Sequence, residues 1–284
     1  MPELPEVETT RRGIETVALG KTLESMQIRQ RQFRWPIPHE LPQAILGARL
    51  ETVKRRGKYL LLGFESGDLI VHLGMSGSVR AVEPHALWRT HDHVQWQFDS
   101  QICLRLHDPR RFGAVLWHPK SAGSVLEHPL LAKLGVEPLQ PQFTPQTLLD
   151  GTRKLRISIK QALLAGHIVV GVGNIYASES LFRARINPQM PAGELTRPQA
   201  SRLVEAVNQT LTDALNSGGS TLRDYVNATG EPGSYFTLHA AVYERDGQPC
   251  RQCDTKIRRI VQGQRATYFC PRCQPLRRKA PCPD

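Results

Sequence analysis

The sequence has no long hydrophobic segment. No stretch approaches about 18 consecutive apolar residues, the length at which a run indicates a membrane-crossing helix. The first residues, MPELPEVETTRRG, also lack the basic stretch and following apolar run of a secretory signal peptide. We therefore expect a cytoplasmic protein without a membrane segment. No internal repeat is present either.

The chain is short of acidic residues. Its 284 residues include 37 Lys and Arg against 26 Asp and Glu, which gives a net charge of +11 and a pI of about 9.7. This excess favours a polyanionic partner, because Lys and Arg release counterions when they bind phosphates. A basic surface that is only solvated is the alternative. The length and the 40% hydrophobic content allow two domains, each with its own core.

Cysteine is scarce, and in a reducing compartment the six cysteines are not expected to form disulfides. Four of them form two CxxC pairs near the end of the chain, a spacing typical of a tetrahedral zinc site. We predict one structural Zn²⁺, with the ligands Cys250, Cys253, Cys270 and Cys273. Of the other two, Cys103 lies in an alternating strand pattern and is predicted to be a buried small hydrophobic residue. Cys282 lies in a Pro-rich tail and is given no role.

The zinc segment is strongly basic. From Arg245 to Asp284 the chain has ten Lys and Arg against three acids. A small metal-folded module with this charge is predicted to bind nucleic acid. The alternative is a zinc staple that only holds the tail to the rest of the protein.

The first half of the chain predicts an antiparallel β-sandwich or barrel. Short strands with turn signals between them are expected over residues 59–64, 68–73, 93–98, 102–106 and 114–118. A charged helix over residues 6–17 is expected to precede them. We assign residues 1–128 to this N-terminal domain, and residues 129–144, rich in Pro and Gly, to a linker.

The second half predicts helices. Thr144-Pro145 is a helix start, residues 153–164 have a helical apolar stripe, and a helix that opens at Thr196-Arg197-Pro198 is expected to stop at Gly218-Gly219. We assign residues 145–239 to a helical domain, 240–276 to a β-rich zinc finger and 277–284 to a basic tail. The fold class is therefore α+β. Residues 220–234 are expected to form a loop.

The N-terminus can carry chemistry. After removal of Met1, Pro2 has a secondary amine, and an α-amino group titrates near about pH 8, so part of it is a neutral nucleophile. Such an amine forms a Schiff base with a sugar aldehyde carbon, and Glu3 lies beside it as a proton donor or acceptor. The alternative from spacing alone is a flexible Pro/Glu-rich start.

Six motifs, in order along nearly the whole chain, resemble those of bacterial formamidopyrimidine-DNA glycosylases. They are MPELPEVE at the start, RGKYL from Arg56, HLGMSG from His72, HDPRRFG from His107, GVGNIYASE from Gly171 and QRATYFC from Gln264. The resemblance implies an N-terminal β-sandwich, a helix–two-turns–helix domain and a C-terminal β-hairpin zinc finger. It also implies a monomer that binds double-stranded DNA containing oxidised purines.

The resemblance implies a chemistry as well. Enzymes of this family remove 8-oxoguanine and formamidopyrimidines from DNA after turning the nucleotide out of the stack. By resemblance, Pro2 attacks C1′ as the Schiff-base nucleophile and Glu3 is a proton donor. β- and then δ-elimination follow, with Lys58 as the proton donor for elimination and Arg265 as the one for δ-elimination.

The same resemblance implies a set of DNA-binding residues. Met75, Arg110 and Phe112 match the residues that fill the gap left by the flipped nucleotide, although a core Met, a core Phe and a turn Arg are the alternatives. Asn174 follows a Gly-rich turn that suits phosphate but lacks the third glycine of a dinucleotide loop, and it is expected to bind phosphate with Arg265. The further predicted DNA contacts are His72, His91, Lys160, Tyr176 and Arg223. His91 and His93 are too few for a metal site.

Two positions depart from the family pattern. Gln161 stands where relatives often have proline, and Arg223 stands where lysine is common, so base contacts from the loop around Arg223 are in doubt. Two other functions compete: an endonuclease VIII-like glycosylase for oxidised pyrimidines, and a zinc-dependent DNA-binding protein without catalysis. Leu4 and the Arg110/Phe112 pair favour the purine enzyme, because the sister branch usually starts MPEG.

Overall fold

The computed structural model describes residues 2–99, 101–219 and 239–276. The chain forms two compact units: residues 2–133 with 214–219 make up unit 1, and residues 134–213 with 239–276 make up unit 2. Each unit has its own hydrophobic cluster. None of the helices in the described ranges is long and apolar enough to cross a membrane.

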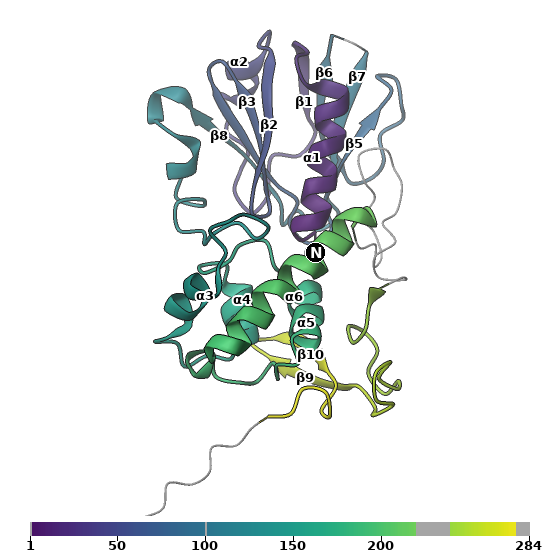
Figure 1. Cartoon of the computed structure of the whole chain (residues 1–284). Helices are drawn as coiled ribbons and strands as arrows, with labels where there is room; N and C mark the ends of the chain where they lie inside the picture. Colours follow the sequence, from purple (N-terminus) through teal and green to yellow (C-terminus); the bar gives the residue numbers. More distant parts are fainter. Residues whose placement is uncertain (1, 100, 220–238, 277–284) are drawn as a thin grey trace, which may run out of the picture. The chain divides into compact units, whose positions relative to one another are not determined.

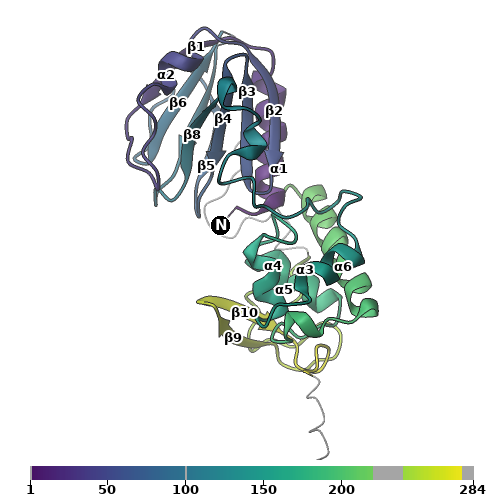
Figure 2. The ribbon, with the colours of Figure 1, turned by 90° about the vertical axis from the view of Figure 1, so that its left-hand side faces the viewer.

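Unit 1 is a sandwich of two four-stranded antiparallel sheets (Figures 1 and 2). One sheet has the strand order β1 (Leu23–Ile28), β6 (Asp92–Phe98), β7 (Ile102–His107), β5 (Ser78–Val82). The other has the order β2 (Leu50–Arg56), β3 (Tyr59–Phe64), β4 (Gly67–His72), β8 (Ala114–Pro119). Alternate residues of the strands point inward and form the core, as in Leu60, Leu62, Trp96 and Leu104. The short helix α2 (Leu41–Ile45) also contributes to it.

Helix α1 (Leu4–Ala18) packs against strands of both sheets, including β2 and β5 (Figure 1). Its start is fixed by Pro5 in the first turn and by a capping box, in which the Glu3 side chain accepts from the N–H of Glu6. The helix ends before Gly20, which has a φ of +78°. The apolar stripe of α1, with Val7 and Ile14 fully buried, places the start of the chain at one end of the sandwich.

Unit 2 combines helices with a zinc-finger hairpin. Its helices are α3 (Pro145–Thr152), α4 (Ile159–Ala165), α5 (Asn174–Arg183), the 3₁₀ turn η3 (Ala192–Glu194) and α6 (Arg197–Asn216). Strands β9 (Arg258–Gln262) and β10 (Arg265–Phe269) form an antiparallel hairpin that packs on α5 (Figure 1). Phe182 of α5 belongs to the same hydrophobic cluster as Cys250 and Cys270.

The sandwich, the helical part and the hairpin confirm the α+β fold class, and all five predicted strands are present within one residue at either end. The helix predicted over residues 153–164 is wrong in its first half. The chain from 153 to 158 is not helical, because Ser158 caps a new helix and forms a capping box with Gln161. Two 3₁₀ turns, η1 (Lys120–Ala122) and η2 (Val125–Glu127), lie just before the predicted linker.

Candidate active site and DNA-contacting residues

Pro2 and Glu3 lie together at the N-terminal end of α1, and both are buried. Glu3 is the N-cap, and its own N–H donates to Oε2 of Glu6 at 2.8 Å. The positive end of the helix dipole favours a negative charge at this position. Glu6 is also buried, and Gly219 approaches it so closely that a β-carbon there would lie 3.1 Å from Oε1 of Glu6. The chain start therefore places Pro2, whose nitrogen becomes a secondary amine once Met1 is removed, beside the buried carboxyl groups of Glu3 and Glu6.

The sequence reasoning missed Glu6, although the spacing could have revealed it. A residue that can cap a helix, followed three positions later by Glu, is the pattern of a capping box. Glu6 holds the backbone of Glu3 in place, so its part in the site is to position Glu3.

Lys58 and His72 lie close together in unit 1. Lys58 is in the turn between β2 and β3, and Tyr59 pairs with His72 across β3 and β4, with 4.7 Å between their ring centroids. Burial lowers the pKa of His72 to about 4, with further lowering by the charges of Lys58 and Arg34. The N–H of Gly74 donates to Nδ1 of His72 at 3.0 Å. At neutral pH His72 is therefore uncharged, with Nε2–H as the donor available to a phosphate.

Met75 and Phe112 come from two turns that pack against each other. Gly74 has a φ of +64°, and a β-carbon there would lie 2.5 Å from the backbone nitrogen of Gly113 and 2.6 Å from the carbonyl carbon of Phe112. Only glycine allows this approach. Met75 is half-buried and Phe112 is 46% exposed. The packing brings the two predicted wedge residues into adjacent turns.

Asp108 holds the Phe112 turn. Its side chain is fully buried and accepts from the N–H of Gly113 at 2.8 Å and from the N–H of Arg110 at 3.3 Å. The Arg110 guanidinium lies 4.7 Å from the ring centre of Phe112. Arg110 is exposed, so both it and Phe112 are presented to a ligand on a turn that a buried carboxylate organises. Asp108 lies inside the HDPRRFG motif, but sequence reasoning assigned it no role.

His91 is exposed in the turn before β6. Its ring centre lies 6.3 Å from that of His93 and 5.9 Å from that of His107. Next to it in the chain, the buried Asp92 forms an ion pair with Arg80 at 2.8 Å, and its Oδ1 is hydrogen-bonded to Nδ1 of His107 at 2.9 Å. Within the described residues, the four zinc-finger cysteines are the group whose ligand atoms could hold a metal ion, and these histidines do not join one.

In unit 2, the side chains of Lys160 and Asn174 both bind the main chain of Ala266, the residue that follows Arg265. Arg265 is exposed at the first position of β10, after Gly263 and Gln264, which both have positive φ. The carbonyl oxygen of Ala266 accepts from Nδ2 of Asn174 at 2.9 Å and from Nζ of Lys160 at 2.9 Å. Helices α4 and α5 therefore fix the strand on which Arg265 lies.

Lys160 and Tyr176 are fully buried. The Lys160 ammonium also donates to Oγ1 of Thr267 at 2.8 Å, so the geometry shows a tie between α4 and the hairpin. The DNA contacts of both residues stay predictions. Asn174 is half-buried at the first position of α5, and its longer bond, 3.4 Å to the hydroxyl of Tyr243, is the one that a phosphate could replace.

Glu179 is a buried anchor that the sequence did not reveal. Its carboxylate accepts from three successive backbone N–H groups, those of Ala241, Val242 and Tyr243, at 2.8–3.0 Å. Burial raises the pKa of this carboxyl, and the three N–H groups oppose the shift. The bonds fix the chain that enters the zinc finger on α5.

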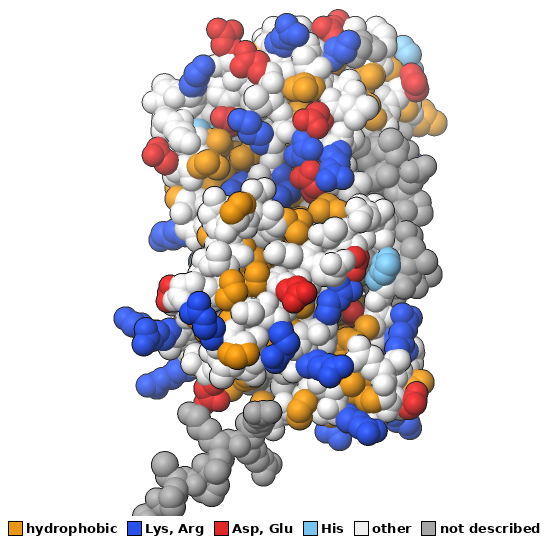
Figure 3. All heavy atoms as spheres, viewed as in Figure 1, with side chains coloured by type: hydrophobic (Ala, Val, Ile, Leu, Met, Phe, Trp, Pro, Cys, Tyr) orange, Lys and Arg blue, Asp and Glu red, His pale blue; other side chains and the backbone are white. Residues whose placement is uncertain are grey.

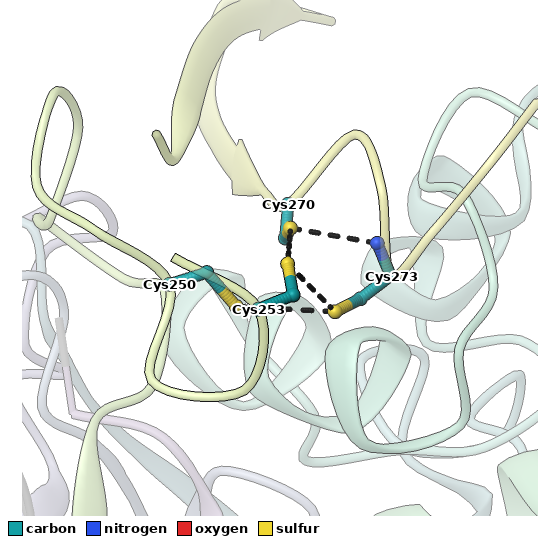
Figure 4. Close-up of side chains that lie close together, drawn as sticks. All are labelled: Cys250, Cys253, Cys270 and Cys273. Atoms are coloured by element: carbon teal, nitrogen blue, oxygen red, sulfur yellow. Dashed lines mark hydrogen bonds between the residues drawn. The ribbon is translucent and has the colours of Figure 1, made fainter. Parts of the chain in front are cut away.

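The four cysteines fit a tetrahedral zinc ion (Figure 4). Their Sγ atoms all lie within 4.8 Å of one another, with 3.5 Å between Cys253 and Cys270 and 3.9 Å between Cys250 and Cys273. Zn–S bonds of about 2.3 Å would place tetrahedral ligands roughly 3.8 Å apart. Hydrogen bonds from Thr255 lower the pKa of Cys253 to about 6, whereas burial raises the pKa of Cys270 and Cys273 in the absence of a metal ion. The donor set and its spacing therefore fit a single structural zinc.

The positive charge is not gathered into one stripe on the face shown in Figure 3. Lys and Arg side chains are interspersed there with acidic and apolar ones.

Three family models match successive parts of the chain. The formamidopyrimidine-DNA glycosylase N-terminal domain matches residues 1–115, the H2TH domain of the same enzymes matches residues 134–226, and a zinc finger found in FPG and IleRS matches residues 247–276. The chain belongs to the formamidopyrimidine-DNA glycosylase family. The predicted family and the predicted structural zinc are thereby confirmed.

Curated relatives and solved structures agree. The chain is 64% identical over 274 residues to the formamidopyrimidine-DNA glycosylase of Bordetella avium, covering 96% of this chain and 99% of the relative. The crystal structure of the MutM (Fpg) protein from Thermus thermophilus is 40% identical, with a TM-score of 0.86 and coverage of 96% and 98%. A Lactococcus lactis Fpg mutant in complex with DNA containing Fapy-dG is 32% identical, with a TM-score of 0.89 and coverage of 97% and 100%.

Some residues that were predicted to have a role in this glycosylase lie outside the described residues. Arg223, the loop predicted around it, Cys282 and the basic tail 277–284 are among them. The roles that the resemblance implies for the motif residues stay predictions. The individual contacts of these residues with DNA stay predictions.

Replacing Arg265 by alanine is expected to weaken binding to every duplex, lesion or not, and to lower the slope of log K against log salt by about one. The reason is that one phosphate contact disappears while the buried ties to Ala266 remain. Fluorescence anisotropy across a salt series measures the slope. Arg251→Ala, which removes another exposed arginine, in the first CxxC pair, is the control. An unchanged slope in the Arg265 variant contradicts the phosphate contact.

Proposed function

We propose that this DNA glycosylase uses Pro2 as the nucleophile and also cleaves the DNA strand at the resulting abasic site. As a family member it acts in base excision repair on oxidised purines. The observation that supports the Pro2 mechanism is the placement of Pro2 beside the buried Glu3 at the start of α1. We further propose that it works in the cytoplasm as a monomer.

The first step replaces the base by the amine. The lone pair of the Pro2 nitrogen attacks C1′, the glycosidic C–N bond breaks, and the base leaves with the bonding electrons and takes up a proton. Loss of the amine proton and opening of the sugar ring, with a proton delivered to O4′, give an iminium at C1′. Glu3 handles these protons.

The iminium then drives two eliminations. The iminium acidifies the C2′ proton, and removal of this proton expels the 3′ phosphate in the β-elimination. Loss of a C4′ proton then expels the 5′ phosphate in the δ-elimination. Lys58 and Arg265 assist as proton donors, and water finally hydrolyses the iminium and restores the amine. No part of these steps uses the zinc ion, which supplies only a cross-link that folds the hairpin.

Binding of a flipped nucleotide requires side chains that fill the gap in the base stack and side chains that bind the phosphates. Met75 and Phe112 occupy its place in the stack, and Arg110 donates to the orphaned cytosine. His72 donates to a phosphate as a neutral group, whereas Arg265 does so as a cation, with Asn174 beside it. The two interlocked glycine turns support the wedge.

The decisive experiment is borohydride trapping. The zinc-loaded protein is incubated with a duplex that contains 8-oxoguanine opposite cytosine, and reduction is expected to give a covalent protein–DNA adduct. A duplex with an oxidised pyrimidine is the comparison. An adduct only on the pyrimidine selects the endonuclease VIII-like alternative, and no adduct on either duplex rejects the enzyme in favour of a non-catalytic DNA-binding protein.

A further inference from the structure

A chain of polar contacts joins helix α1 to the turn that carries Lys58. The carboxylate of Glu8, in the second turn of α1, accepts from Nε of Arg55 in β2 at 3.1 Å. Nη1 of Arg55 in turn donates to the carbonyl oxygen of Gly57 at 2.9 Å. This carbonyl belongs to the peptide group that leads into Lys58, so the contacts connect that peptide group to α1.

The Glu8–Arg55 pair is shielded from solvent, since each side chain is only 14% exposed. Glu8 also accepts from Nε of Arg11 and Nε of Arg12, both at 3.1 Å. Burial opposes the charge on Glu8, but the charges of Arg11 and Arg55 and the hydrogen bonds from Arg11 and Arg12 outweigh it, so the pKa of this carboxyl is lowered. Glu8 is therefore ionised at neutral pH and can hold Arg55. Figure 3 shows acidic and basic side chains gathered along α1.

The geometry of the turn makes the orientation of the peptide group that leads into Lys58 dependent on the bond from Arg55 to the Gly57 carbonyl. Gly57 and Lys58 form a two-residue connection between Arg56 and Tyr59, which are paired in the hairpin. Gly57 has a φ of +57°, as the first residue of a tight hairpin turn requires. The peptide group between the two turn residues can point in either of two directions in such turns. The bond from Arg55 holds the Gly57 carbonyl, and so this peptide group, in one of the two directions.

We propose that Glu8 is a positioning residue that sets the place of the Lys58 amine relative to Pro2 and Glu3. It does so through Arg55 and the Gly57–Lys58 peptide group. Pro2 and Glu3 lead directly into the helix that carries Glu8, so this helix holds the nucleophile at its start and, indirectly, the proton donor for elimination. The proposal rests on the proposed function, because that function gives Lys58 its role.

The test measures strand cleavage separately from DNA binding. Glu8→Gln keeps the shape of the side chain but removes its charge, and single-turnover cleavage of a preformed abasic duplex is expected to be about tenfold slower. The dissociation constant for a duplex with a tetrahydrofuran analogue is expected to stay within about twofold of wild type. Arg12→Gln is the control: it removes a partner of the same carboxylate whose side chain is 58% exposed, and it leaves the Arg55 contact intact.

A double-variant comparison tests the route through Arg55. If Glu8 acts through Arg55, the Glu8→Gln/Arg55→Gln protein is as slow as Arg55→Gln alone. If Glu8→Gln fails to fold, Arg55→Lys, which cannot keep both directed bonds of the guanidinium, is expected to show the same loss of rate.

Several outcomes overturn the proposal: an unchanged cleavage rate in the Glu8 variant, an equal loss in Arg12→Gln, losses that add in the double variant, or a loss matched by weaker DNA binding. A wild-type protein that does not cleave abasic DNA would instead reject the proposed function. The two failures are therefore distinguishable.

Discussion

Pro2→Gly is expected to lower the yield of borohydride-trapped adduct on abasic DNA by about 100-fold, the cost of misplacing a reacting group by roughly 1 Å. Glycine still offers an amine, but it is a primary amine without the pyrrolidine ring that holds the Pro2 nitrogen in one direction. Pro2 is buried beside Glu3, so a flexible residue there loses the defined approach to C1′. Adduct yield on a denaturing gel, with DNA affinity measured in parallel, reports the loss.

Pro5→Ala is the matched control for this variant. Pro5 is also a buried proline in the same stretch, in the first turn of α1, but it bears no terminal amine. Its replacement is expected to leave trapping near the wild-type level. Full trapping by the Pro2 variant would contradict the need for proline, and replacement of Lys58 in that variant would then show whether a lysine is the nucleophile.

Removal of zinc is expected to lower DNA affinity at least about 100-fold, because the free energy of metal binding is the folding energy of a small metal module. The cluster of Phe182, Val242, Ile257 and Tyr268 includes Cys250 and Cys270, so the packing of the hairpin on α5 depends on the metal site. Arg265 loses its fixed strand, and catalysis fails with binding. Cys253→Ser measured by anisotropy, with zinc content determined by mass spectrometry, tests this.

Cys103→Ala is the control for zinc loss. Cys103 is fully buried in β7 of unit 1, away from the four metal-ligand cysteines in the sequence, and burial raises the pKa of its thiol. Its replacement leaves the zinc ligands in place. The core of the sandwich contains none of the four ligands, so unit 1 is expected to keep its circular dichroism and unfolding transition in Cys253→Ser. Retained DNA affinity in a zinc-free protein would contradict the role of the hairpin as a grip.

The fold could be predicted from the sequence where local signals are strong. Strand alternation with turn residues marks β3 to β8, apart from β5, and the CxxC spacing marks the zinc site. Strands β1 and β2 carry weaker alternation, with Glu24, Gln27 and Lys54 among their exposed positions, and they were not predicted. The boundary at Ser158 was missed because an apolar stripe continues across it, although the spacing of Ser158 and Gln161 is that of a capping box.

The residues proposed as catalytic are marked by sequence motifs, but the residues that hold them in place were not predicted. Pro2, Glu3 and Arg265 stand in motifs that mark them by type and position. Asp108 accepts from N–H groups only two and five residues further along the chain, so its role belongs to a local turn. The role of Glu179, in contrast, depends on N–H groups that lie 62 to 64 residues away in the chain. Nothing in the local pattern encodes such partners, so only the structure reveals them.

The carbonyl of Ala266 has a consequence for how this enzyme can vary in evolution. Asn174 and Lys160 both bind a main-chain oxygen, which every amino acid supplies. Exchange of the side chain at position 266 leaves that oxygen in place, so the selective constraint of the contact falls on the two donors, which lie on separate helices. Selection that preserves the position of Arg265 is therefore expected to act on Lys160 and Asn174.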